Sequence, residues 1–136
     1  QALCRPAWPS QTVNALLPSP AYYVWRTIAT IMDDFYPLEY KVSFSGDKEP
    51  LSYTFRSGDD KQVLLATWIQ GSLGETTEES KGDLTLMNVR AKQAWALDIF
   101  NGTEQELKLS VVGSDTVLNR MLIKDYPVII RLQKRS

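Results

Sequence analysis

After Pro37, apolar residues recur at every second position in short runs that polar turns separate. The runs 40–45 and 51–56 both alternate strictly between apolar and polar side chains. Such alternation puts the apolar side chains on one face of a β-strand and the polar ones on the other. The run 62–70 is apolar at consecutive positions, which is typical of a central strand covered on both sides. The pattern therefore predicts a β-sheet protein with a buried central strand.

The number and spacing of these runs indicate the architecture. About eight short strands recur roughly every 8–12 residues, the spacing of sandwiches and barrels and not of alternating strands and helices. An Asn-Gly pair at Asn101-Gly102 predicts a tight hairpin between two of them. We therefore expect a mainly β chain, an antiparallel β-sandwich over residues 37–136 with one N-terminal α-helix. The expected strands are 40–45, 51–56, 62–70, 83–89, 93–100, 104–112, 116–123 and 126–132.

One helix is expected before the strands, over residues 19–36. Ser19 is a good N-cap and Pro20 suits the first helical position. The helix should end before Pro37, because the residue before a proline disfavours α geometry. Four prolines among the first twenty residues predict an extended lead-in over 1–18. Apolar residues recur at helical spacing along one face, namely Ala21, Val24, Trp25, Ile28, Ile31, Met32 and Phe35.

Composition excludes several classes of protein. Fifteen basic and sixteen acidic residues give a net charge of −1, so the chain lacks the strong excess of positive charge that is typical of nucleic-acid-binding proteins. No His occurs, which excludes Ser-His and Cys-His nucleophile pairs. A single Cys, Cys4, excludes an intrachain disulfide. The longest apolar runs are far shorter than the ~20 residues of a membrane span. We expect neither nucleic acid nor membrane as a partner, and either an extracellular or a cytoplasmic location.

Three stretches carry a family resemblance. Residues 20–27, Pro-Ala-Tyr-Tyr-Val-Trp-Arg-Thr, look like the last helix packed on a (β/α)8 glycoside hydrolase barrel. Residues 98–107 look like a hairpin of the β-sandwich that follows such barrels, and residues 123–132 look like its closing strand. The chain thus resembles the C-terminal β-sandwich region of clan A-like glycoside hydrolases, together with the preceding barrel helix.

The resemblance implies a domain without catalytic residues. In such enzymes the acid/base and nucleophile carboxylates lie at strand ends of the barrel, and no part of this chain matches a barrel strand. The implied partner is a catalytic (β/α)8 domain, in the same chain or in a neighbouring subunit. The apolar stripe of the helix would then cover either the barrel or the sandwich.

Aromatic residues are the candidates for carbohydrate contact, because sugars stack on flat, exposed rings. Strand alternation assigns Tyr40, Tyr53 and Trp95 to the core. Five rings remain as possible surface rings, namely Trp68, Trp8, Tyr23, Tyr36 and Tyr126. Of these, Trp68, Trp8 and Tyr126 are the candidates for carbohydrate binding. Trp68 has an alternative role in core or interdomain packing, because its strand looks covered on both sides. The sequence shows no obvious aromatic platform.

Carboxylates offer two further sites. Asp59 and Asp60 lie in a turn whose oxygens suit Ca²⁺, although no Asp-x-Asp-x-Asp-Gly pattern is present. Glu104 and Glu106 share one strand face about 7 Å apart, a spacing that a pair of glycosidase carboxylates could have. Ordinary solvated charges are the preferred interpretation of both pairs. No cofactor is expected, and Ca²⁺ is the one metal considered.

Three functions follow from these observations. The first is a non-catalytic accessory domain that stabilises or flanks a catalytic barrel. The second is a free-standing carbohydrate-binding module that uses exposed aromatic rings. The third is a small glycosidase that uses paired carboxylates. Solvent-facing rings across one sheet would favour the second, and two buried carboxylates facing each other in a cleft would favour the third.

Overall fold

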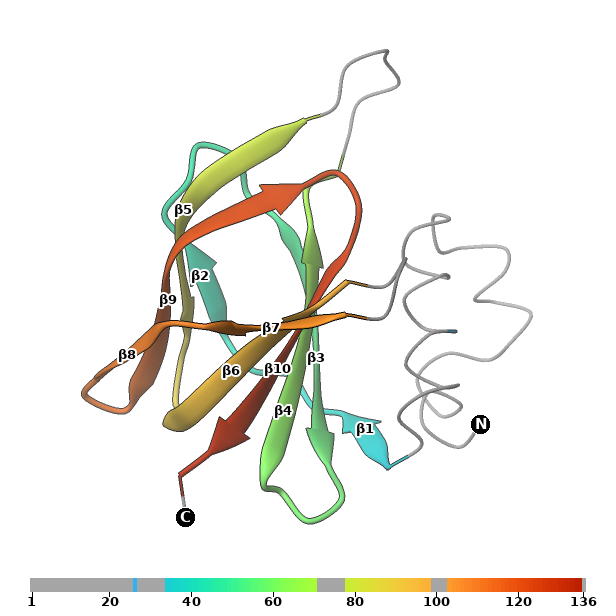
Figure 1. The fold of residues 1–136 in the computed structure, drawn as a ribbon, viewed down its shortest axis with the longest axis vertical. Helices are drawn as coiled ribbons and strands as arrows, with labels where there is room; N and C mark the ends of the chain where they lie inside the picture. The colour runs from blue at the N-terminus through green and yellow to red at the C-terminus, as the bar shows by residue number, and fades with distance from the viewer. Residues whose placement is uncertain (1–25, 27–33, 71–77, 99–102, 136) are drawn as a thin grey trace.

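The computed structural model describes residues 26, 34–70, 78–98 and 103–135. These form ten strands in two antiparallel sheets packed face to face as a sandwich (Figure 1). The expected mainly β, antiparallel sandwich is confirmed, with ten strands where about eight were expected. The strands are β1 (Phe35–Pro37), β2 (Val42–Phe44), β3 (Leu51–Ser57), β4 (Gln62–Trp68), β5 (Glu79–Leu86), β6 (Ala91–Leu97), β7 (Glu104–Leu107), β8 (Leu109–Val112), β9 (Asp115–Lys124) and β10 (Val128–Lys134).

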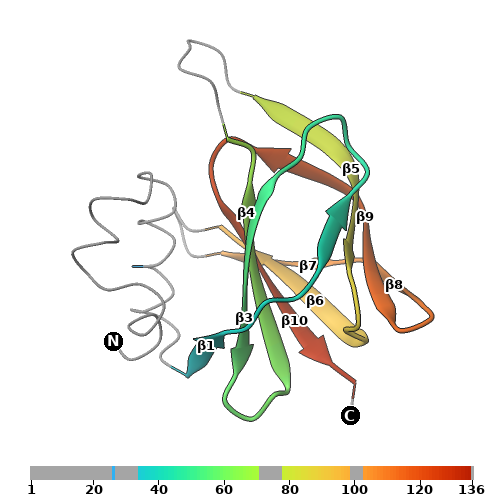
Figure 2. The same ribbon diagram turned by 180° about the vertical axis from the view of Figure 1, so that it is seen from behind.

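The two sheets differ in size and contain strands from distant parts of the chain. The larger has the order β1-β3-β4-β10-β6-β7 and the smaller has the order β2-β5-β9-β8. Seen from behind, the link from β1 to β2 passes from the larger sheet to the smaller one (Figure 2). The sandwich core lies between the sheets and contains Val63, Leu65, Leu84, Leu118, Ile130 and Leu132, all 2% exposed or less.

The strand β4 is central, as its sequence predicts. It pairs with β3 on one side and with β10 on the other. Its residues Val63 and Leu65 belong to the core between the sheets, whereas Leu64, Ala66 and Trp68 alternate with them and so lie on the opposite face. All five are 2% exposed or less. The larger sheet is therefore apolar and buried on both faces along this strand.

The expected strand 104–112 is two strands that belong to different sheets. Its first part, β7, pairs with β6 in the larger sheet, and its second part, β8, pairs with β9 in the smaller one. The hairpin expected around Asn101-Gly102 is supported by its flanks, where Leu97 pairs with Glu104 and the Asp98 N–H donates to the Thr103 carbonyl at 2.9 Å. The turn itself lies outside the described residues.

The expected helix 19–36 needs a correction at its end. Phe35 and Tyr36 form β1 with Pro37, paired antiparallel to β3 at the edge of the larger sheet. A proline is tolerated there because an edge strand leaves some N–H groups without a partner in the sheet. Arg26 is helical, and the rest of the helix and the whole lead-in 1–18 lie outside the described residues. No helix in the described residues is long and apolar enough to cross a membrane.

Candidate functional site

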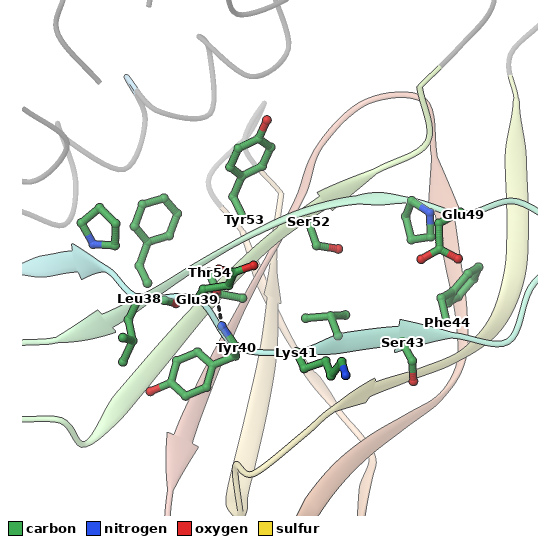
Figure 3. A pocket seen from close by; sticks show the side chains of 14 residues that line it. Leu38, Glu39, Tyr40, Lys41, Ser43, Phe44, Glu49, Ser52, Tyr53 and Thr54 are labelled. Atoms are coloured by element: carbon green, nitrogen blue, oxygen red, sulfur yellow. Dashed lines mark hydrogen bonds between the residues drawn. The ribbon is translucent and has the colours of Figure 1, made fainter. Parts of the chain in front are cut away.

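An open groove of about 660 Å³ lies where the edges of the two sheets meet (Figure 3). Residues 37–44, which pass from β1 into β2, form one side, and residues 49, 50 and 52–55 form the other. Its lining mixes carboxylate, hydroxyl and phenol groups, including Glu39, Glu49 and Ser52. The two tyrosines of the groove, Tyr40 and Tyr53, point away from each other. The groove therefore has polar groups for a ligand and no pair of parallel rings.

Thr54 holds one wall of this groove in place. Its hydroxyl donates to the Leu38 carbonyl at 2.6 Å and accepts the Tyr40 N–H at 3.0 Å. These two bonds, together with the backbone bond from the Leu38 N–H to the Thr54 carbonyl at 3.2 Å, hold the link between the sheets beyond the end of β1. Partial burial raises the pKa of the Tyr40 phenol above its ordinary value, while the positive charge of Lys134 acts in the opposite sense. Tyr40 is half-buried and packs against the core, close to its expected role.

Trp68 is buried, which corrects its prediction as a sugar-binding ring. Its side chain is 2% exposed, and its ring stacks on that of Tyr53 with centroids 5.4 Å apart and planes 11° apart. A sugar needs a ring face open to solvent, and Trp68 does not offer one. The alternative, a packing role, fits its position on the outer face of the larger sheet.

Tyr126 is exposed, as its candidate role requires. The side chain is 41% exposed and lies beside the Lys124 ammonium, 5.6 Å from the ring centroid. Together with Leu122 and Pro127 it lines a hollow of about 250 Å³. The Tyr126 ring and the Lys124 ammonium group beside it therefore form a small amphipathic surface. Trp8, the third candidate, lies outside the described residues.

Asp59 and Asp60 are both engaged within the protein. An Asp59 oxygen accepts the Ser57 hydroxyl at 2.7 Å and the Lys61 N–H at 3.0 Å, while Asp60 pairs with Lys134 at 3.2 Å. The Ser57 hydrogen bond is the main cause that lowers the pKa of the Asp59 carboxyl. Asp60 also has a positive φ of 60°, which the turn requires. Among the described residues, no group of three or more His, Cys, Asp or Glu could hold a metal ion.

The pair Glu104 and Glu106 lies at the surface of β7. Both residues are exposed, and Glu104 accepts two hydrogen bonds from the Arg131 guanidinium, each at 3.2 Å. The same guanidinium lies 4.2 Å from the centre of the Trp95 ring. Strand alternation gives no sign of this cluster and assigns Trp95 to the core. Trp95 is in fact half-buried under Arg131, its direct neighbour in the register of β6 and β10.

The described strands define an antiparallel β-sandwich domain with an open groove at one edge. No protein-family model matches the sequence, and no curated protein matches it. Among solved structures, the fold is similar to part of the α-L-fucosidase isoenzyme 2 from Paenibacillus thiaminolyticus, with a TM-score of 0.50 and 7% sequence identity. The similarity covers 85% of this chain and 17% of that glycoside hydrolase. At this identity the likeness is one of fold alone.

Proposed function

We propose that this chain is a non-catalytic accessory β-sandwich domain of a carbohydrate-active enzyme. It stabilises or flanks a catalytic (β/α)8 domain, in the same chain or in a neighbouring subunit. The observation that supports this most is the asymmetry of the fold similarity: nearly the whole chain is similar to a small part of a much longer glycosidase. The sequence resemblance to sandwiches that follow glycoside hydrolase barrels points the same way.

The arrangement of carboxylates agrees with an accessory role. Glycoside hydrolysis needs two carboxyl groups facing each other across the bond to be cleaved. Glu104 is occupied by Arg131, and Asp59 accepts hydrogen bonds within its own turn. Both of these acids therefore already have partners within the protein. A catalytic barrel would supply the reacting pair.

A carbohydrate-binding module is the second candidate, and the hollow at Tyr126 favours it. An exposed ring beside a lysine offers a stacking surface and a hydrogen-bond donor to a sugar hydroxyl. Tyr126 is the one aromatic ring among the described residues that line this hollow, whereas a binding module usually needs several contacts to hold a polymer. We therefore place this function second.

Affinity electrophoresis of residues 1–136 through gels with different soluble polysaccharides separates the candidates. Tyr126→Ala is the test variant, and Tyr36→Ala is a matched control because the two tyrosines are 41% and 40% exposed. The same protein is assayed for hydrolysis of a panel of aryl glycosides. An accessory domain migrates freely through every gel and releases no aryl alcohol.

Either alternative gives a different result. Retardation by one polymer that Tyr126→Ala abolishes and Tyr36→Ala keeps would identify a binding module and its ligand class. Turnover of an aryl glycoside that Glu104→Gln or Glu106→Gln removes would identify a glycosidase. Both results would contradict a purely accessory role.

A further inference from the structure

Both sheets end at the groove in a strand edge that no other described strand covers (Figure 3). β2 is the last strand of the smaller sheet. β3 is paired with β1 only from Phe55 to Ser57, and its earlier residues run on along the groove. A free strand edge carries backbone N–H and C=O groups that can pair with another extended chain.

The hydrogen bonds of β2 show which of its backbone groups point to its free edge. On the side of β5, the Lys41 carbonyl accepts a backbone hydrogen bond at 2.9 Å and the Ser45 N–H donates one at 3.0 Å. In an antiparallel pair, residues bonded to the partner strand alternate with residues that are not. The backbone groups of Val42 and Phe44 therefore point away from β5, and both residues line the groove.

The free edge of β3 follows from the way the chain leaves this strand. The bond from the Leu38 N–H to the Thr54 carbonyl extends the register of β1 and β3 by one residue pair. Two residues further on, the same register would place Tyr40 opposite Ser52, but the Tyr40 N–H donates to the Thr54 hydroxyl instead. The backbone groups of Ser52 point to the same side as those of Thr54. Within the described residues, they have no backbone partner on that side.

The side chains around these edges define the kind of chain that fits. Glu39 and Glu49 are exposed on opposite sides of the groove, and in the part of the chain that the structure describes neither carboxylate belongs to an ion pair. Lys41 is the one basic residue among the described lining residues, so the groove is acidic. Three half-buried apolar side chains line it and also pack against the core, namely Tyr40, Val42 and Phe44.

We propose that the groove binds an extended peptide segment of a partner protein, with alternating apolar and basic residues, as an added β-strand. An extended segment has two hydrogen-bonding edges, so it can pair with Val42 and Phe44 on β2 and reach Ser52 on β3. Its apolar side chains contact the inner side of the groove, and its basic side chains meet Glu39 and Glu49. Backbone pairing supplies the affinity, and the alternate side chains supply the specificity. This inference goes beyond the proposed function, because it holds with or without a catalytic barrel.

Fluorescence anisotropy of a labelled peptide of alternating lysine and valine tests the proposal on the whole chain. Two matched probes separate the contributions to binding. In one, glutamate replaces every lysine, which reverses the charge and keeps the pattern. In the other, the backbone nitrogens are methylated, so that the peptide can no longer donate hydrogen bonds to a strand edge.

Variants of the chain test the same two contributions from the other side. Val42→Pro removes the edge N–H of β2, and Val42→Ala shortens the same side chain but keeps that N–H. Glu39→Gln combined with Glu49→Gln removes the two carboxylate charges. Glu79→Gln is the control for charge, because Glu79 is an exposed carboxylate of β5 outside the lining of the groove.

We expect saturable binding of the lysine-valine peptide, and binding weaker by about tenfold after Val42→Pro or with the methylated probe. The glutamate probe and the double glutamine variant should also bind more weakly, most clearly at low salt. Val42→Ala and Glu79→Gln should bind much like the parent. Should circular dichroism show that Val42→Pro is unfolded, the methylated probe decides against the unchanged chain.

Three results would overturn the proposal. The first is no saturable binding of the lysine-valine peptide by the parent. The second is equal binding of the methylated probe or of the glutamate probe. The third is retardation by a soluble polysaccharide, abolished by Glu39→Gln, without peptide binding, which would assign the groove to a sugar. Glycosidase activity of the chain, or sugar binding at Tyr126, would contradict the proposed function and leave the peptide result unaffected.

Discussion

Leu64 and Leu65 are neighbours on β4, both 0% exposed, and they point to opposite faces of the larger sheet. Leu65 packs between the two sheets, whereas Leu64 lies on the outer face. If both faces are equally well packed, Leu64→Ala and Leu65→Ala should each lower the free energy of unfolding by about 2–5 kcal/mol, since each leaves a cavity. With a urea m-value of about 2 kcal/mol/M, a loss of about 3 kcal/mol moves the midpoint by roughly 1.5 M.

Urea unfolding of the whole chain, followed by circular dichroism, measures this effect. Val112→Ala is the control, because Val112 is 63% exposed and its truncation should change stability by less than about 0.5 kcal/mol. The reasoning is refuted if Leu64→Ala behaves like Val112→Ala while Leu65→Ala loses the full amount. That result would mean that the outer face is not packed when the chain stands alone.

Three further predictions concern buried and surface polar groups. Thr116 is fully buried, and its hydroxyl donates to the Val89 carbonyl at 2.6 Å and accepts the Ala91 N–H at 2.9 Å. Thr116→Val should therefore cost about 1–3 kcal/mol in urea unfolding and Thr116→Ser much less, because only serine keeps both bonds. Hydrogen bonds lower the pKa of Asp59, so its stabilisation is complete above the ordinary value of 3.8 and is lost as the pH falls through the lower folded pKa. The stability difference between the parent and Asp59→Asn should be constant above pH 5 or so and shrink in stronger acid; a difference that grows in acid would contradict this. The thermal unfolding midpoint in millimolar Ca²⁺ should equal the midpoint in EDTA. A clearly higher midpoint in Ca²⁺ would contradict this and would support the turn at Asp59 as a metal site.

The sandwich could be predicted because its signal is local. Alternation along 40–45 and 51–56 reports one buried face directly, and the apolar run of β4 reports two. The crossing between β7 and β8 could not be found in this way. Leu107 in β7 and Leu109 in β8 both pack against the core, although the two strands belong to different sheets. The alternation of apolar and polar residues therefore continues unbroken where the chain passes from one sheet to the other.

The candidate site was harder to predict because it depends on register. Arg131 and Glu104 are 27 residues apart in the sequence and meet only through the pairing of β10, β6 and β7. Trp95 follows Ala94, so both faces of β6 carry apolar residues and alternation cannot say which one is inward. Phe35 continues the apolar stripe of the expected helix, yet its backbone lies in β1 and pairs with Ser57 of β3. In each case the pairing of strands in the folded chain, and not the local sequence pattern, decides where the residue lies.

The size and activity of the natural polypeptide test the central proposal most directly. Antibodies raised against residues 37–136 would be used to detect and precipitate the protein from the cells that make it. The account predicts that the precipitate contains a catalytic domain, joined in one polypeptide well above 15.4 kDa or bound as a subunit, and that it hydrolyses aryl glycosides. A polypeptide of 15.4 kDa, with the glycosidase activity left in the supernatant, would contradict an accessory role in a carbohydrate-active enzyme.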